Sequence, residues 1–381
     1  MIKRIIFLLL FPVLCQAQMA FNNQGDIKIH SNGNIGFHID VNNDGSITQD
    51  SGTAGFYNTD QSIIVTGTQT PQFYNLVIDV LDHLFLENSV TVTNTAAFLN
   101  GDVITNRTDT DIALQFKSDA LYDFVVNSRK VDGYASITGV NGFEFPIGQN
   151  NKLRPLSIIN NNTQEGYSAA YFYENPSFPS TFNQGFYTNV RAQNVDKVSS
   201  IEYWDLNGLA PTKTILTWDV ESQIPDLTTN LQELIVVGWS RQENKWVNLG
   251  NTAFTGNLDS GTITSSDILP YLYDVITIGK ITTFEEIENI DVYTAVTPNN
   301  DGYNDFFHID GVEFKTVNLF IYNRWGRIVY NNTRYDNSFN GKANRSMYLY
   351  EKDQLPAGTY FYTFTVKETG QSKAGYLYVT Y

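Results

Sequence analysis

Residues 317–330 read Val-Asn-Leu-Phe-Ile-Tyr-Asn-Arg-Trp-Gly-Arg-Ile-Val-Tyr. Aliphatic side chains alternate with polar and aromatic ones as far as Tyr322, and this period of two is typical of a β-strand whose two faces differ. Gly326 can supply the left-handed conformation of a tight turn, after which Ile-Val-Tyr can form a returning strand. The stretch therefore predicts a β-hairpin with one aliphatic face, one aromatic face and Arg324-Trp325-Gly326 at its turn.

Short alternating runs of this kind fill the rest of the chain. Asn-Gly or Asp-Gly pairs, which favour turns with positive φ, recur along the chain, for example at positions 32, 44, 100, 132, 141 and 340. No segment has the apolar spacing of a helix, so the fold class is predicted to be all-β.

Three β regions are predicted after residue 17. Residues 290–381 favour a compact Ig-like β-sandwich, and residues 144–281, with roughly seven predicted strands, also indicate a β-sandwich. Residues 282–289 read as a short acidic linker. In residues 18–143, short strands rich in Asn, Thr and Gly favour a solenoid-like region. An ordinary antiparallel sandwich explains the same pattern, and no strict repeat period is visible.

The N-terminus has the layout of a secretory signal peptide. Two basic residues precede an apolar run at residues 5–14, and Cys15-Gln16-Ala17 then places small residues where cleavage after Ala17 requires them. Acylation of Cys15 is the alternative, although Leu14 is larger than the residue expected before a lipidated cysteine. The run is shorter than the roughly 20 residues of a membrane span, and no later segment qualifies, so no transmembrane span is predicted in the mature chain.

Charge and cysteine content exclude several classes of function. The chain has 24 basic and 40 acidic side chains, a formal net charge of −16. So acidic a surface repels nucleic-acid phosphates, and nucleic-acid binding is therefore not predicted. Cys15 is the only cysteine, so a chain cleaved after Ala17 has no disulfide, thiol nucleophile or cysteine metal ligand.

Four segments near the C-terminus carry a resemblance to a known family. In order they are Thr-Pro-Asn-Asn-Asp-Gly-Tyr-Asn-Asp-Phe-Phe at 297–307, Phe-Ile-Tyr-Asn-Arg-Trp-Gly-Arg-Ile-Val-Tyr at 320–330, Leu-Pro-Ala-Gly-Thr-Tyr-Phe-Tyr at 355–362 and Gly-Tyr-Leu-Tyr-Val at 375–379. The set closely resembles the gliding motility-associated C-terminal domain of Bacteroidetes, the type B sorting signal of the type IX secretion system. The resemblance implies that the secretion machinery is a partner and that the protein reaches the outer-membrane surface or the medium.

The resemblance also implies which residues the machinery recognises. They belong to an acidic loop and to the hairpin turn: Asn299, Asp301, Gly302, Asn304 and Asp305 in the loop, and Arg324, Trp325 and Gly326 in the turn. Each set has a second interpretation. The loop oxygens can form Asx turns or gather around a cation, and Trp325 can pack across the sheet with Arg324 stacked on a ring.

The clearest ligand-like pattern is Asp-Val-Asn-Asn-Asp-Gly-Ser-Ile-Thr-Gln-Asp at residues 40–50. Oxygen-bearing side chains at the first, third and fifth positions, followed by Gly, are what a Ca²⁺ loop requires. Ser51 stands where such a loop has a bidentate Glu, and a turn in which Asn and Asp side chains bond the backbone explains the same residues. The candidate calcium ligands are Asp40, Asn42, Asp44, Thr48 and Asp50.

No motif of nucleophilic, zinc-protease or phosphate-loop chemistry occurs, so the chain is predicted not to be an enzyme. Residues 18–281 are compatible with two main roles. One is a structural or adhesive surface protein that contacts another surface protein, and the other is a glycan-binding module; a polysaccharide-acting enzyme ranks third. An exposed, coplanar pair such as Trp239 and Trp246 would favour glycan stacking, whereas buried rings would favour a structural role.

Overall fold

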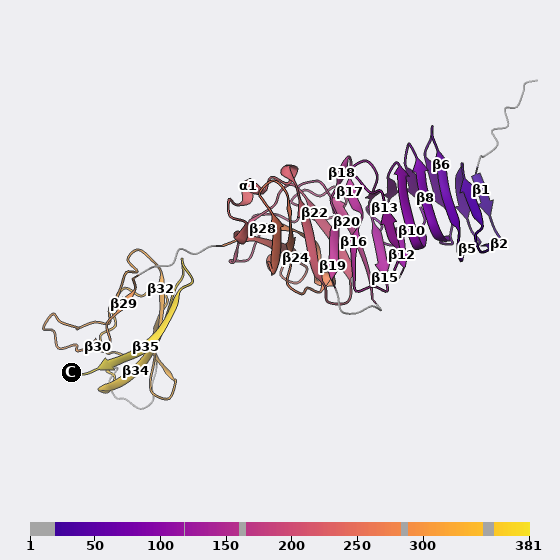
Figure 1. Ribbon diagram of the computed structural model, residues 1–381. Coiled ribbons are helices and arrows are strands. Elements are labelled where there is room, and N and C mark those ends of the chain that lie inside the picture. Colours follow the sequence, from indigo (N-terminus) through magenta and orange to yellow (C-terminus); the bar gives the residue numbers. More distant parts are fainter. Residues whose placement is uncertain (1–19, 118, 160–164, 283–288, 346–353) are drawn as a thin grey trace, which may run out of the picture. The chain divides into compact units, whose positions relative to one another are not determined.

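The computed structural model describes residues 20–117, 119–159, 165–282, 289–345 and 354–381. The predicted signal peptide at residues 1–17 lies outside the described residues, as do residues 283–288 of the predicted linker. The chain divides into two compact units with the boundary after Thr282, and each is described by itself (Figure 1). Strands dominate both units, which confirms the all-β prediction.

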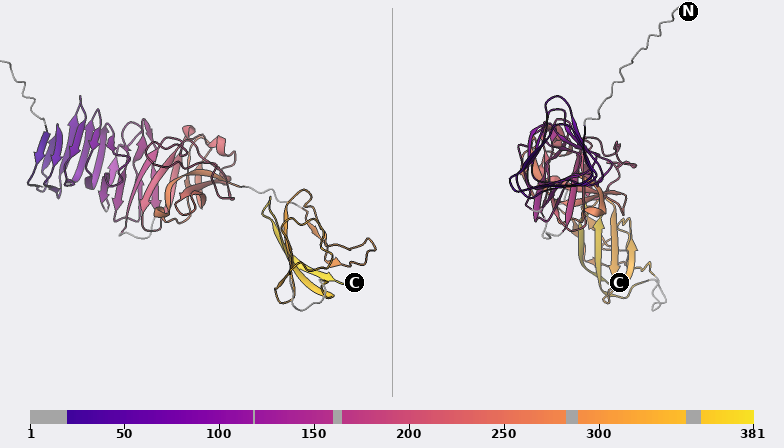
Figure 2. Two further views of the ribbon diagram at one scale, coloured as in Figure 1. Left: turned by 180° about the vertical axis from the view of Figure 1, so that it is seen from behind. Right: turned by 90° about the vertical axis from the view of Figure 1, so that its right-hand side faces the viewer.

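Three stacks of parallel strands form a solenoid at the start of the first unit, and Figure 2 shows them end-on. The first rung pairs with the second strand by strand. The third and fourth rungs each contain one long strand that bends round a corner and so belongs to two stacks. The solenoid-like prediction is confirmed.

The strands of successive rungs are as follows: β1 (Ala20–Asn23), β2 (Asp26–Ile29) and β3 (Asn34–Phe37); β4 (Asp40–Asn43), β5 (Ser46–Gln49) and β6 (Thr53–Asn58); β7 (Ile63–Thr66) and β8 (Gln72–Val80); β9 (Leu84–Leu86) and β10 (Val90–Asn100); β11 (Val103–Thr105), β12 (Leu114–Lys117) and β13 (Leu121–Asp123); β14 (Val131–Asp132) and β15 (Ala135–Thr138).

The rungs differ in length, so the sequence shows no repeat period from which the solenoid could be recognised. Val103 pairs with Val131, 28 residues further on, whereas Val131 pairs with Ile147, only 16 residues further on. What repeats is burial: inward-facing residues such as Val41 and Ile47 are 2% and 1% exposed. Polar side chains also stack between rungs, for example where the Asn23 amide donates to Asn43 Oδ1 over 2.7 Å.

Antiparallel strands follow the solenoid and form two facing sheets. One sheet continues from β15 through β20 (Gly166–Phe172), β22 (Tyr203–Gly208), β28 (Tyr273–Ile281), β24 (Leu234–Ser240) and β25 (Lys245–Gly250), with β21 (Val195–Val198) paired to β28. The other contains β16 (Gly142–Phe145), β19 (Leu156–Ile159), β23 (Lys213–Trp218), β27 (Gly261–Thr264) and β26 (Ala253–Gly256). One hydrophobic core runs from Ile29 to Ile278, so the solenoid interior continues between these sheets.

The remaining elements of this unit are short: β17 (Ile147–Gln149), β18 (Lys152–Leu153), the 3-10 helices η1 (Val220–Ser222), η2 (Leu231–Glu233) and η3 (Pro270–Leu272), and the helix α1 (Ile224–Leu227). No helix in the described parts of the chain has the length and hydropathy needed to cross a membrane.

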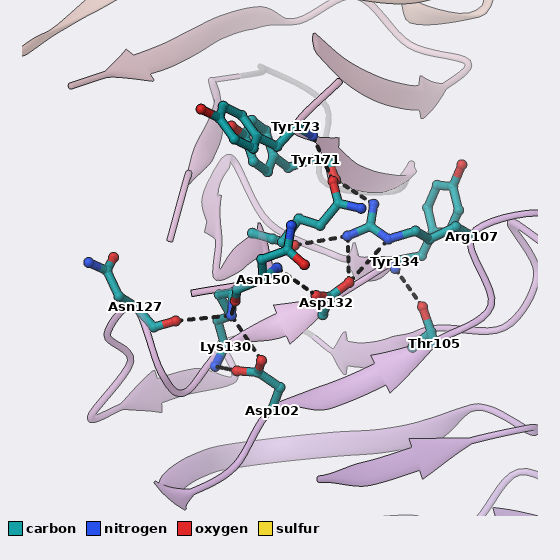
Figure 3. Close-up of polar contacts among 12 residues, drawn as sticks. Asp102, Thr105, Arg107, Asn127, Lys130, Asp132, Tyr134, Asn150, Tyr171 and Tyr173 are labelled. Atoms are coloured by element: carbon teal, nitrogen blue, oxygen red, sulfur yellow. Dashed lines mark hydrogen bonds and ion pairs between the residues drawn. The ribbon is translucent and has the colours of Figure 1, made fainter. Parts of the chain in front are cut away.

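Buried charges lie where the solenoid meets the two sheets (Figure 3). The Lys130 ammonium, which is fully buried, donates to Asp102 Oδ2 over 2.9 Å and to backbone carbonyls. The Arg107 guanidinium donates to Asp132 over 2.6 Å, to the Gly148 carbonyl over 3.0 Å and to the Tyr171 carbonyl. Arg107 therefore joins the solenoid to β17 and β20. Because these charges are paired and lie buried or partly buried, we interpret them as structural.

Asp205 on β22 is a buried carboxylate whose pKa is raised above the ordinary value of an aspartate. Its Oδ2 accepts the Tyr134 hydroxyl over 2.6 Å and its Oδ1 accepts the Asn207 amide over 3.0 Å. Burial outweighs these bonds and raises the pKa of Asp205 to about 6. An acid whose pKa is higher in the folded state than in the unfolded state loses stability when it ionises. The stability that the protonated Asp205 side chain contributes to the fold is therefore lost as the pH rises through about 6.

Asp205→Asn tests this contribution by removing the ionisable group with little change of shape. Relative to the parent chain, we expect the free energy of unfolding of the variant to increase between about pH 4 and about pH 7.5. The increase is at most roughly 3 kcal/mol, for a shift of about two pKa units. Urea unfolding at the two pH values measures it, with the exposed Asp60→Asn as control. Parallel pH profiles for Asp205→Asn and the parent chain would contradict the prediction.

The second unit is a small sandwich. A five-stranded sheet runs in the order β30 (Ala295–Val296), β35 (Ser372–Val379), β34 (Gly358–Val366), β32 (Val317–Tyr322) and β33 (Ile328–Asn332). A two-stranded sheet pairs β29 (Asp291–Val292) with β31 (Ile309–Asp310). The predicted alternation in β32 is confirmed, since Val317, Leu319 and Ile321 are buried in the core and the intervening side chains face outward.

Candidate functional site

Four strand ends meet at one end of the five-stranded sheet. Tyr322, near the end of β32, pairs with Phe361 near the start of β34. Gly358, the first residue of β34, pairs with Val379 at the end of β35, and Val379 pairs in turn with Val296. The segments that follow or precede these ends are the hairpin turn, the Pro356 loop, the C-terminus and the 299–305 loop. Segments far apart in sequence are thus brought to one end.

The hairpin turn is held by the side chain of Asn323. Its Oδ1 accepts the backbone N–H groups of Trp325 and Arg327, each over 3.0 Å, and Asn323 is only 8% exposed. Gly326 adopts φ +75°, the conformation that favours glycine. Because the backbone is fixed in this way, the turn presents its side chains in a defined direction.

Trp325 projects from this turn into solvent and is 70% exposed. The Arg324 guanidinium carbon lies 4.2 Å from the centre of the indole ring, close enough for a cation–π contact. The interpretation in which Trp325 packs across the sheet is therefore wrong, whereas the stacking of Arg324 on a ring is confirmed. A sheet can cover a residue within a strand, but Trp325 lies beyond the end of β32.

A groove of about 240 Å³ lies beside the turn, lined by residues 323–325 and 356–360. Its second wall is fixed by the Tyr360 hydroxyl, which donates to the Pro356 carbonyl over 2.9 Å. We call these lining residues the C-terminal groove. Two of the four segments quoted above therefore form opposite walls of one groove, with an exposed indole and guanidinium at its rim.

The 299–305 loop folds on its own side chains. Asp305 accepts the backbone N–H of Asn300 over 2.7 Å and that of Gly302 over 2.9 Å. Asp301 accepts the backbone N–H of Tyr303 over 2.8 Å, and this bond is the main reason why the pKa of Asp301 is lowered. The Asn299 amide also donates to Asp301 over 2.9 Å. The Asp301–Tyr303 bond is an Asx turn, because it joins a side chain to the backbone two residues on, whereas Asp305 bonds backbone groups that precede it. The loop has no contact with Arg324 or Trp325 among the interactions of the described residues.

The outward side of the five-stranded sheet is aromatic and carries no charge along three of its strands. Tyr322, Phe361 and Tyr376 form one row across β32, β34 and β35. Phe361 is 47% and Tyr376 is 59% exposed. A solvated sheet face normally carries polar and charged side chains. We call the following residues the aromatic face: Phe320, Tyr322, Thr359, Phe361, Thr363, Thr365, Ser372, Ala374, Tyr376 and Tyr378.

The candidate calcium loop lies on two strands and the turn between them. Asp40 and Asn42 belong to β4 and Thr48 to β5, and Asp44 is in the turn. Asp40 accepts the backbone N–H of Ile64, Asp44 accepts that of Thr68, and Asp50 forms an ion pair with Lys28 over 2.9 Å. The structure brings Asn42 and Asp44 together, and the Asn42 amide donates to Asp44 Oδ2 over 3.2 Å. Calcium binding remains a prediction.

The tryptophans of the first unit are buried. Trp204 and Trp246 are 0% exposed, Trp218 is 2% and Trp239 is 5% exposed. Trp239 and Trp246 meet edge to face at 81°, with their centres 5.8 Å apart. These rings form core contacts and present no flat surface on which a sugar could stack.

Residues 290–379 match the family model of the CHU_C type IX secretion signal domain. The match covers the sandwich that carries the C-terminal groove and the aromatic face, and it confirms the resemblance stated from the sequence. No curated protein matches the chain. No solved structure matches it. A type IX secretion signal implies export to the cell surface or the medium.

Proposed function

We propose that the type IX secretion machinery recognises this protein through the C-terminal groove, with the Arg324–Trp325 pair as the main contact. After export, residues 20–282 serve as a structural or adhesive body on the surface of a Bacteroidetes cell or in its medium. The proposal includes a signal peptide that is cleaved after Ala17. It assigns the first unit no catalytic role.

One observation carries the recognition site: an exposed indole and guanidinium stand on a rigid turn beside a groove built by a second segment of the same family motif. Tryptophan and arginine dominate the binding energy of protein interfaces, because each buries a large area with little loss of conformational freedom. The adjoining aromatic face lacks charge, which is the usual composition of an interface centre. The machinery therefore has an anchor in the groove and a wider apolar surface beside it.

Burial of the tryptophans supports a structural or adhesive role over glycan stacking through the middle region. The solenoid adds length, because each rung extends the unit by one strand spacing of about 4.8 Å. An acidic, elongated body of this kind is suited to presenting a contact surface away from its attachment point.

Trp325→Ala tests the recognition site. Loss of an anchoring indole costs about 2 kcal/mol or more, equivalent to roughly 30-fold weaker binding of the machinery. We expect the Trp325→Ala variant to accumulate in the periplasm. The conservative variant Trp325→Phe should retain much of the export of the parent chain. Protease shaving of intact cells, followed by fractionation, measures the surface and periplasmic fractions. Thermal unfolding confirms that the exposed substitution leaves the fold intact.

Phe314→Ala is the matched control, because Phe314 is also an aromatic side chain in full solvent contact. It precedes β32, at the other end of the sheet from Trp325. We expect export of this variant to equal that of the parent chain. Normal export of Trp325→Ala would refute the assignment of the groove, and equal defects in both variants would indicate a general effect of surface aromatics.

A further inference from the structure

The first rung of the solenoid has an open side. Among the described residues, β1, β2 and β3 pair with β4, β5 and β6 of the second rung and with no other strand. Figure 1 shows this rung at one end of the unit. The unpaired N–H and C=O groups of three edge strands can pair with a further chain.

The apolar interior is incompletely covered at this end. Phe21, Ile27 and Ile35 are only half-buried, although they face the interior. In the second rung the corresponding positions of β4 and β5, Val41 and Ile47, are 2% and 1% exposed. The other end of the solenoid is covered, because β15 pairs with the antiparallel strand β20 and β17 pairs with β18.

The first rung carries no net charge, although the chain as a whole is acidic. Asp26 and Lys28 are the only Asp, Glu, Lys or Arg residues between positions 20 and 39, so the rung is neutral within a chain of net charge −16. Both lie on β2 and face outward. Two copies of this acidic protein can therefore approach each other at this end with little like-charge repulsion.

We propose that this end binds a second copy of the chain, with the two β2 strands antiparallel across a twofold axis. The Gly25 carbonyl points toward Gly45 in the second rung. The N–H and C=O groups of successive residues in a strand point to opposite sides, so those of Asp26 and Lys28 face the open side. These are the groups that hydrogen-bond across the axis.

Charge then selects the register of the pairing. With Ile27 on the axis, Asp26 of each copy lies opposite Lys28 of the other, and the pair occurs twice. A shift by two residues places Asp26 opposite Asp26 or Lys28 opposite Lys28, which is unfavourable. Lys28 already pairs with Asp50, but both side chains are more than half exposed, so that contact contributes little and leaves Lys28 available.

The same twofold axis brings β1 of each copy against β3 of the other. The interface includes three short strands from each copy, and its total area of roughly 1,000 Å² is at the low end for specific interfaces. The dimer is therefore expected to dissociate on dilution. The dimer is closed, because each copy uses the first rung, the end of the solenoid that no described strand covers.

Charge reversal tests the register in a chain that begins at Gln18, the product of the proposed cleavage. We expect sedimentation of the parent chain to show a concentration-dependent dimer. Lys28→Asp should raise the dissociation constant at least about tenfold, since it creates two like-charge pairs. Asp26→Lys should do the same, and the double variant D26K/K28D should restore the dimer. Lys117→Asp, an exposed reversal on β12, is the control.

Cysteine cross-linking tests the geometry independently, because a chain that begins at Gln18 has no cysteine. Ile27 opposes itself at a non-hydrogen-bonded position, where Cα atoms approach within about 4.5 Å, in the range of a disulfide. Ile27→Cys should therefore form a covalent dimer on oxidation. Lys28→Cys, one residue further along, should not.

A chain that stays monomeric up to roughly 100 µM, far above a micromolar dissociation constant, would overturn the proposal. So would failure of the double charge variant to restore a dimer, because the charge pairs would then not set the register. Equal cross-linking of the two cysteine variants, or a ladder of higher oligomers, would exclude the closed antiparallel arrangement. Export plays no part in these measurements, so their outcome is separate from that of the Trp325 experiment.

Discussion

A chain truncated after Thr282 is expected to remain in the periplasm in a folded state. Residues 283–381 contain the whole match to the type IX secretion signal domain. Among the residues that the structure describes, the hydrophobic clusters of the first unit end at Ile281, so the truncation removes no described residue of that core. Export should therefore be lost while the stability of the first unit is kept. Surface labelling of intact cells and thermal unfolding of the purified chain measure the two effects.

The converse fusion strengthens this test. Residues 283–381 joined to a periplasmic reporter should carry the reporter to the surface, and the same fusion with Trp325→Ala should not. If the truncated chain still reaches the surface, the first unit contains an export signal of its own. In that case the C-terminal groove would have to serve another partner.

A local pattern was sufficient to predict the two faces of β32 in the second unit. The alternation of Val317 to Tyr322 depends only on the period of a strand, and it correctly placed one aliphatic and one aromatic face. The exposure of Trp325 could not be derived in this way. It depends on β32 ending at Tyr322 and on the bonds of Asn323, which hold the turn beyond the edge of the sheet.

In the first unit, local sequence patterns predicted less of the structure. Strand composition favoured a solenoid, but rungs of unequal length left no period from which the pairing of Val103 with Val131 could be read. The charge pair of Arg107 and Asp132 near the junction was also missed, because the two residues are 25 positions apart and nothing local links them. Lys130 is fully buried, and no motif around it in the sequence indicates this. Lysine is rarely buried, so a run such as Asn-Ser-Arg-Lys-Val-Asp gives no signal of burial.

Among the substitutions proposed here, Glu202→Ala is expected to lower the free energy of unfolding the most. Glu202 is 1% exposed and accepts Arg154 Nε over 3.1 Å and the Tyr171 hydroxyl. Burial disfavours the charge of Arg154, but Glu202 and Asp219 outweigh it and raise the pKa of Arg154. Removal of Glu202 leaves the buried guanidinium with Asp219, which is 41% exposed, as its remaining acidic partner. Breaking a buried pair from one side costs about 3–5 kcal/mol.

Removing the whole network distinguishes an uncompensated charge from a lost packing contact. In the variant R154M/E202L/Y171F, apolar side chains of similar size replace the pair and the hydroxyl that donates to Glu202. We expect this variant to recover most of the stability lost in Glu202→Ala, because no buried charge then lacks a partner. Urea unfolding of the two variants and the parent chain provides the comparison. If the triple variant is as unstable as Glu202→Ala, the cost comes from packing and shape, and the pair contributes a geometry that apolar side chains cannot reproduce.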